Sequence, residues 1–307
     1  MSKYIFSNLI GAFVFDGKFN LEDSILLKDL KDFENKEKFE EKLSKKHKDL
    51  KKPNNNELKT ILNFFKNKKY YSDFYSKNLQ LTKKQIKESV NEDLLIIQAV
   101  SNIVEIDKIS NILVKRLREW YSLYNPEFVK SIFDNEKFVE LILKKTKKES
   151  DSMGAELDKK DLDPILSLAS QINNLFEFRK NNETYLENLM KKYCPNLNEI
   201  AGTLIGAKLL EKAGSLRRLV LMPASTIQIL GAEKALFRHL KTKKKAKPPK
   251  FGLLFMHPLF SKARRENYGK IARALGDKIA IAVKIDYFKG KFLGDKLKKG
   301  LEDKFKQ

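Results

Sequence analysis

An unbroken heptad constrains the fold of this chain more than any other feature. Between residues 165 and 189, eight mostly apolar residues recur at alternating steps of three and four, which places them on one face of a helix. Such a seam spans about 36 Å of helix at roughly 1.5 Å per residue, and a second helix must cover it. We therefore expect a long helical hairpin, in which Asp163 caps this helix and Pro164 lies in its first turn. The seam consists of Ile165, Leu168, Ile172, Leu175, Arg179, Asn182, Leu186 and Leu189.

The sequence leaves open which helix covers the seam. A plain bundle core and a self-associating antiparallel coiled coil fit the heptad equally well. The polar layer at Arg179 and Asn182 would lower stability but fix the register or a dimer partner. A second stripe predicts a long helix from about Lys83 to Tyr121, with its buried face at Ile86, Val90, Leu94, Ile97, Val100 and Val104.

The segments around these helices have weaker signals. Pro126 breaks the first helix, helical spacing resumes over residues 128–142, and the polar stretch 144–163 is expected to form the hairpin tip. Residues 4–19 indicate a small sheet with a tight Asp16-Gly17 hairpin turn, and the polar stretch 51–56 breaks short helices. We expect no signal peptide and no membrane span, because no run of 18 apolar residues exists.

Positive charge is concentrated in the last third of the chain. Residues 201–307 carry 26 Lys and Arg against 8 Asp and Glu, whereas the first 200 residues carry 36 against 32. This asymmetry is typical of a module that binds a polyanion, with nucleic acid as the leading partner and an acidic membrane surface as the weaker one. One cysteine and three scattered histidines argue against a disulfide framework or a metal site, and we expect a reducing compartment.

The basic third reads as a helical module with one cationic face. We expect Gly214 to end one helix, and the Ser225-x-x-Gln228 spacing to cap the start of another. The latter helix should pack through Ile229, Ala232, Leu236 and Leu240. Its opposite face carries Lys234, Arg238 and Lys241 and leads into the lysine-rich loop 241–250, which favours phosphate binding over a merely solvated face.

The stretch after this loop has two possible meanings. Residues 251–255 predict a short buried strand, and His257 follows it as a turn or cap residue or as a ring that stacks on an unpaired base. A helix through Leu275 and Ile285 comes next. Ahead of Leu275, a basic segment carries the predicted RNA contacts, because arginine can bind phosphate with two hydrogen bonds. These contacts are Arg264, Arg265, Asn267, Lys270 and Arg273.

Several runs of residues resemble one family. MPASTIQILGAEKALFRHLK (222–241), PKFGLLFMHPL (249–259) and GKIARALGDKIAIAVKID (269–286) closely resemble the Nop domain of archaeal core scaffold proteins of box C/D RNA-guided 2′-O-methylation particles, a Nop56/Nop58-related family. RLREWY (116–121), SMGAELD (152–158) and PNLNEIAGTLIGAKLLEKAGSL (195–216) follow in the expected order. The resemblance covers about residues 86–290.

The resemblance implies a mainly α fold of three parts: a small N-terminal α/β domain, a long antiparallel coiled-coil helical hairpin, and a mostly helical C-terminal Nop domain. Residues 1–118 would hold the methyltransferase fibrillarin, 119–198 would form a homodimer, and 199–307 would bind a kink-turn of the box C/D guide RNA together with a ribosomal-protein-like partner. By position, Lys234, Arg238 and His257 would contact RNA. No cofactor is expected on this chain, since S-adenosylmethionine would belong to the partner.

We therefore expect a noncatalytic scaffold. An enzyme is disfavoured, because the sequence has no phosphate-binding glycine fingerprint, P-loop, metal-ligand spacing or nucleophile elbow. The alternative is a spliceosomal-type Nop scaffold that binds a kink-turn without a methyltransferase. The chain lacks the long charged tail of eukaryotic members, which favours an archaeal, cytoplasmic protein over a nucleolar one. It also departs from the family at residues 121–128 and 22–80.

Overall fold

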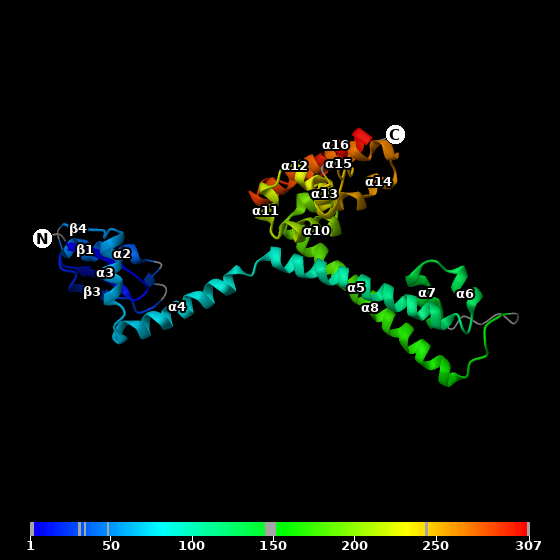
Figure 1. Cartoon of the computed structure of the whole chain (residues 1–307), viewed down its shortest axis with the longest axis horizontal. Helices are drawn as coiled ribbons and strands as arrows, with labels where there is room; N and C mark the ends of the chain where they lie inside the picture. The colour runs from blue at the N-terminus through cyan, green and yellow to red at the C-terminus, as the bar shows by residue number, and fades with distance from the viewer. Residues whose placement is uncertain are drawn as a thin grey trace. The chain divides into compact units, whose positions relative to one another are not determined.

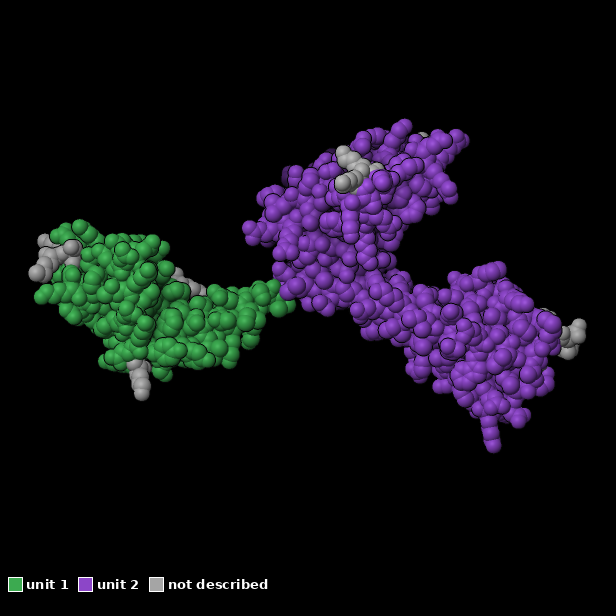
Figure 2. Space-filling view, in the orientation of Figure 1, with its two compact units in different colours: residues 1–90 green, residues 91–307 purple. Residues whose placement is uncertain are grey.

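The computed structural model describes residues 3–29, 32–33, 35–47, 49–144, 152–242 and 245–305. The chain divides into two compact units, residues 1–90 and 91–307 (Figures 1 and 2). Among the described residues, no helix is long and apolar enough to cross a membrane.

Unit 1 is built on a sheet whose central strand is apolar on both faces. The described residues form four strands in the order β3-β2-β1-β4, antiparallel except for the β1/β4 pair. Phe13 and Phe15 of β2 pack on one face with Ile61, while Val14 packs on the other with Leu43. The strands are β1 (Lys3–Ser7), β2 (Gly11–Phe15), β3 (Leu21–Leu26) and β4 (Leu50–Lys51), and the helices are α2 (Lys36–Lys46), α3 (Asn55–Phe64) and α4 (Lys68–Ser89).

The predicted hairpin turn joins β2 to β3, but its geometry differs from the expectation. The Asp16 carboxylate accepts hydrogen bonds from the backbone N–H groups of Lys18 and Asn20, both at 2.8 Å. These bonds organise a longer loop, so the positive backbone angle falls on Phe19 (φ 62°) and not on Gly17. The break predicted at 51–56 is confirmed, since Asn54 forms a capping box that begins α3.

Unit 2 begins with a long helix, whose start was predicted wrongly. Helix α5 spans Glu92–Tyr121, not residues 83–121, because the Asn91 side chain accepts a hydrogen bond from Leu94 N–H and caps a new helix there. The predicted face does not run on from α4 (Lys68–Ser89) into α5, and Ile86, Val90 and Leu94 are 62%, 59% and 43% exposed. Val100 is buried as predicted, and Ile97 and Val104 are half-buried. The buried stripe consists of Ile96, Ala99, Val100, Ile103, Ile106, Ser110, Val114, Leu117 and Tyr121, together with Asp93.

The second long helix, α8 (Lys159–Tyr193), also starts earlier than predicted. Asp158 occupies the N-cap position and Pro164 lies inside the helix, so Asp163 is not the cap. Proline is tolerated there because the carbonyl group it leaves without a donor belongs to Lys160, which is exposed to water. Residues 145–151 of the predicted hairpin tip lie outside the described residues.

The heptad of α8 is covered by α5 of the same chain (Figure 1). Ile165, Ile172 and Leu186 are fully buried, and Leu168 and Leu189 pack at the edges of the two hydrophobic clusters. The predicted mainly helical fold with a long helical hairpin is thereby confirmed. The homodimer stays a prediction.

The polar layer of the heptad pairs within the hairpin. Arg179 donates a hydrogen bond to the Asp107 carboxylate on α5, and its Nη1 lies 3.0 Å from Glu183 Oε1. Asn102 Nδ2 donates to Asn182 Oδ1 at 3.1 Å. The layer therefore fixes the register of α5 against α8, as such polar layers do in coiled coils.

Two short helices, α6 (Pro126–Ser131) and α7 (Asn135–Leu143), pack near the far end of the hairpin and confirm the helical spacing predicted over 128–142. The Arg118 guanidinium holds them. It donates to the carbonyl oxygens of Val129, Ile132 and Phe133 at 2.8–3.2 Å and to Asn135 Oδ1. It also lies 4.2 Å from the ring centroid of Phe138.

The C-terminal part of unit 2 is a helical module around α15, whose face formed by Leu275, Ile279 and Ala282 is fully buried, as predicted. Gly214 ends α10 with φ 82°, also as predicted. The helices are α9 (Pro195–Ala201), α10 (Thr203–Ala213), α11 (Leu216–Leu221), α12 (Ala224–Ile229), α13 (Glu233–Lys241), α14 (Pro258–Ser261), α15 (Tyr268–Tyr287) and α16 (Gly294–Phe305), with the 3-10 turns η1 (Leu253–Met256) and η2 (Arg265–Asn267).

Two buried carboxylates, which the sequence analysis did not single out, tie this module together. Asp286 accepts hydrogen bonds from Asn196 N–H (3.1 Å), Asn196 Nδ2 (2.7 Å) and Leu197 N–H (2.9 Å), which joins α15 to the start of α9. Asp93 of α5 accepts from Leu216 N–H at 3.0 Å. Burial raises the pKa of both carboxyl groups, although the hydrogen bonds offset part of that shift.

Three local predictions in this module were wrong. The apolar run 251–255 is not a strand: its last three residues belong to the 3-10 turn η1, and the described residues offer it no neighbouring strand to pair with. Ser225 does not cap α12, which starts at Ala224; Gln228 instead donates to the Lys250 carbonyl at 2.7 Å. Gly231, with φ 91°, then separates α12 from α13. The single stripe predicted for residues 229–240 is therefore split between two helices.

Candidate nucleic-acid interface

The first part of the interface is the cationic face of α13. Lys234, Arg238 and Lys241 are all exposed on this helix, as their spacing predicted. The turn at Gly231 sets the start of α13, and the Glu233 carboxylate accepts the Gly231 N–H at 2.6 Å. Leu240, which was expected to pack, is 58% exposed because α13 is a separate short helix. The face therefore carries three cations that form no ion pair with any described residue, beside apolar surface.

The loop after α13 is held to the module at both ends. The Ala246 carbonyl accepts a hydrogen bond from the His239 ring, and Ala246 N–H donates to Thr242 Oγ1 at 3.2 Å. Its far end is held by the bond from Gln228 to Lys250. Lys243 and Lys244 of the lysine-rich segment lie outside the described residues. Exposed Lys245 and Lys247 add positive charge next to the α13 face.

His257 caps a helix, which is one of the two roles expected for it. Its Nδ1 accepts Leu259 N–H at 3.3 Å and so caps α14, and its Nε2 donates to the Ile200 carbonyl at 3.0 Å. Burial lowers the pKa of the ring, which keeps it neutral at neutral pH. Because both ring nitrogens are engaged, only the ring face and edge remain for an RNA contact, and that contact stays a prediction.

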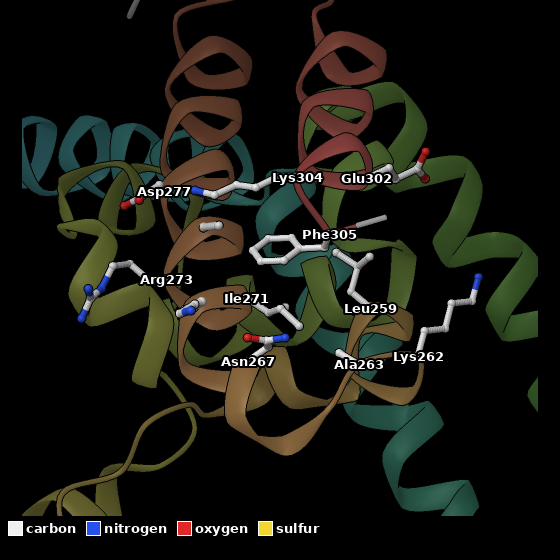
Figure 3. Close-up of a pocket in the computed structure, with 12 residues that line it drawn as sticks. Leu259, Lys262, Ala263, Asn267, Ile271, Arg273, Asp277, Glu302, Lys304 and Phe305 are labelled. Atoms are coloured by element: carbon white, nitrogen blue, oxygen red, sulfur yellow. The ribbon is translucent and has the colours of Figure 1, made fainter. Parts of the chain in front are cut away.

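The remaining predicted residues lie on η2 and α15. Arg264, Arg265, Lys270 and Arg273 are exposed, while Asn267 is half-buried at the start of α15. The fold brings Asn267, Lys270 and Arg273 together with Lys262 in one groove of about 810 Å³ (Figure 3). The α13 residues, His257, Arg264 and Arg265 do not line this groove. The predicted contacts are thus distributed over at least two surfaces of the module.

An aromatic cluster stands between the lysine-rich loop and α15, and the sequence analysis missed it. Phe251 stacks on Phe255 with ring centroids 4.8 Å apart, and Phe260 and Tyr268 pack edge-on against Phe255 at 5.4 and 5.7 Å. Phe255 is 47% exposed. The apolar run 251–255 was the available signal, but it was interpreted as a buried strand.

The described residues were expected to hold neither a metal site nor a reactive cysteine. Among them, no group of three or more His, Cys, Asp or Glu side chains could hold a metal ion. Cys194 is fully buried and burial raises the pKa of its thiol, so it is not a nucleophile at neutral pH.

Comparison with known proteins identifies a family for this chain. The family model described as "Nop: snoRNA binding domain, fibrillarin" matches residues 102–307. An uncharacterized NOP5 family protein of Methanocaldococcus jannaschii is 41% identical over 264 residues, which cover 77% of this chain and 62% of that protein. Nucleolar protein 58 of Schizosaccharomyces pombe is 40% identical over 217 residues, 63% of this chain and 42% of that protein.

Nucleolar protein 56 of Homo sapiens is 37% identical over 251 residues, which cover 72% of this chain and 42% of that protein. The chain therefore spans less than two thirds of the length of these relatives. A solved structure described as the crystal structure of a fibrillarin/Nop5p complex is 28% identical and covers 98% of both chains, with a TM-score of 0.45.

Proposed function

This chain belongs to the Nop family of Nop5-, Nop56- and Nop58-related proteins, and on that premise we propose that it is a noncatalytic scaffold of a box C/D guide ribonucleoprotein. In this role it binds guide RNA through the basic module of unit 2 and recruits fibrillarin for 2′-O-methylation of RNA. The observation that carries the proposal is the exposed cationic face of α13, on the segment that matches the snoRNA-binding family model.

The charge on this module supports RNA as the ligand. Lys234, Arg238 and Lys241 form no ion pair with other described residues, so their charges are available to phosphates. Lysine and arginine at such a surface give affinity without reading sequence. The proposal therefore assigns recognition of the RNA to its folded shape, in this case a kink-turn already bound by a small ribosomal-protein-like partner.

The remaining roles are divided among the other parts. Fibrillarin is assigned to residues 1–118, a homodimer to the hairpin within 119–198, and RNA to 199–307. S-adenosylmethionine would bind to fibrillarin and not to this chain. We assign the particle to the cytoplasm of an archaeon, or to the nucleolus in a eukaryote, where the related proteins are nucleolar proteins 56 and 58.

Reconstitution with guide RNA, the kink-turn protein and fibrillarin tests the scaffold. The double variant Lys234→Ala/Arg238→Ala should weaken RNP assembly by about tenfold or more and reduce the log–log salt slope by about 1 per residue, while fibrillarin binding stays intact. Lys115→Ala/Arg116→Ala removes the same charge types from exposed positions of α5, outside the RNA-binding module, and serves as the matched control for RNA binding alone. Joint loss of both activities in a well-folded α13 variant would contradict the division of roles.

Two further outcomes distinguish the alternatives. Copurification of fibrillarin with the chain favours the box C/D scaffold, whereas stable kink-turn binding without fibrillarin favours a spliceosomal-type scaffold. Guide-directed methylation by the purified chain alone would make it an enzyme and overturn the proposal. RNA affinity that stays flat from low to moderate salt would count against the α13 face as the binding surface, since each phosphate contact contributes a slope of about −0.7 to −0.9.

A further inference from the structure

The groove of about 810 Å³ in the C-terminal module lies between α14, α15 and α16 (Figure 3). Its inner wall is apolar and is formed by Leu259, Ile271 and Ala274. The Phe305 ring projects from the end of α16 toward α15 and gives the groove an aromatic surface. A volume of this size lies within the range of sites that hold a small molecule or one nucleotide.

The rim of the groove is cationic. Lys262, Lys270 and Arg273 stand on it, and none of them forms an ion pair with another described residue. Lys304 lies with its Nζ 5.9 Å from the Phe305 ring centroid. Two carboxylates, Asp277 and Glu302, also line the groove. The surplus of positive charge is therefore modest and suits one phosphodiester better than a highly charged free polyphosphate.

A polar side chain inside the groove is left without a partner. The Asn267 amide points along the groove beneath Ile271 and makes no hydrogen bond within the described part of the chain (Figure 3). An amide offers both a donor and an acceptor, which matches the edge of a nucleobase. The side chain is half-buried and lines the groove, so a ligand in the groove can form hydrogen bonds with it.

We propose that this groove binds one unpaired nucleotide of an RNA strand. The base stacks on Phe305, its edge pairs with Asn267, and the flanking phosphates lie on the cations of the rim. A paired base cannot enter such a groove, because it would have to leave its stack and its partner, whereas bases in bulges and ends are free to do so. Arg264 and Arg265, exposed on the adjoining turn η2, continue the cationic path. The inference rests on the proposed function, and adds to it which RNA element this surface selects.

Two matched RNA probes test the proposal with the full chain. One is a fully paired stem, and the other is the same stem with a single bulged 2-aminopurine, whose fluorescence is quenched when it stacks. The wild-type chain should bind the bulged stem more tightly and quench its fluorescence. Phe305→Leu should lose the quenching and about tenfold or more in affinity for the bulged stem only, because stacking on an aromatic ring is what the leucine removes.

Three variants keep the result interpretable. Phe305→Tyr retains the ring and should behave as wild type, and Phe288→Leu removes a phenylalanine that is 72% exposed outside the groove and should also change nothing. Because Phe305 packs against the core, Phe305→Leu could loosen α16. Asn267→Ala leaves that packing intact and should still lower the preference for the bulged stem severalfold.

Different results would contradict the nucleotide site in the groove and the RNA-binding role of the chain. If the wild-type chain binds both stems equally and Phe305→Leu and Asn267→Ala change neither binding nor fluorescence, the groove is not a nucleotide site, and a protein segment becomes its occupant. The proposed function survives that result. If the wild-type chain fails at low salt to bind even a kink-turn guide RNA that carries the kink-turn protein, the RNA-binding role itself is wrong.

Discussion

Replacement of Asp286 by alanine tests the frame that holds the RNA-binding module together. The carboxylate accepts three hydrogen bonds from residues at the start of α9, and Asn196 in turn accepts Leu293 N–H at 2.7 Å ahead of α16. At roughly 1.5 kcal/mol per bond to a charged group, the loss amounts to about 4.5 kcal/mol. Burial raises the pKa of Asp286, which indicates a desolvation cost that the variant recovers, so we expect a net loss of about 3 kcal/mol.

The loss should appear as a lower midpoint in urea unfolding followed by circular dichroism, and as faster amide exchange at Asn196 and Leu197. Asp277→Ala removes an exposed carboxylate from the same helix and should stay within about 0.5 kcal/mol of wild type. Unfolding free energies that are equal for the two variants would refute the reasoning, because the buried donors at the start of α9 would then have found other partners.

Three other perturbations have defined outcomes. Arg118→Ala should cost about 3 kcal/mol and speed amide exchange in α6 and α7, because it leaves several carbonyl groups without their donor, while exchange in α15 stays unchanged. Hydrogen bonds from Lys46 and His47 lower the pKa of Asp23 from 3.8 to about 2. The ionised carboxylate therefore stabilises the folded chain above pH 3.8, and this contribution is lost as the pH falls toward 2. Asp23→Asn should make the thermal-unfolding midpoint less dependent on pH between these values. Gly231→Ala should destabilise unit 2 by at least about 1 kcal/mol in urea unfolding, since φ is 91° and the added Cβ would lie 2.6 Å from a Leu253 carbon.

Periodicity predicted the helices whose buried faces are continuous. The α8 heptad and the α15 stripe run over several turns, so the apolar pattern alone determined both elements and their buried sides. Short elements were less predictable. The apolar run 251–255 led into a 3-10 turn, because local tertiary contacts outweigh a pattern of five residues. The expected helix over 225–240 was divided at Gly231, whose positive φ a continuous helix does not allow.

The candidate site also contains residues that local patterns predicted and residues that they did not. The cations of α13 were predictable because they lie on one face of one helix. Phe305 and Lys304 of the groove were not, because they are separated from Asn267 by more than thirty residues and no local pattern links them. The residue at which each helix starts was also missed where a single asparagine or aspartate, such as Asn91 or Asp158, outweighed the apolar spacing.

The sequence by itself determined the helical class, the long seam of α8 and the excess of positive charge near the carboxyl end, because these are properties of spacing and composition. Only the tertiary structure decided that α5 covers the seam and pairs with Arg179, that Asp286 joins α15 to α9, and that α16 encloses the groove beside Asn267. Such contacts join residues far apart along the chain. They depend on how the helices pack, and packing is not encoded in any local pattern.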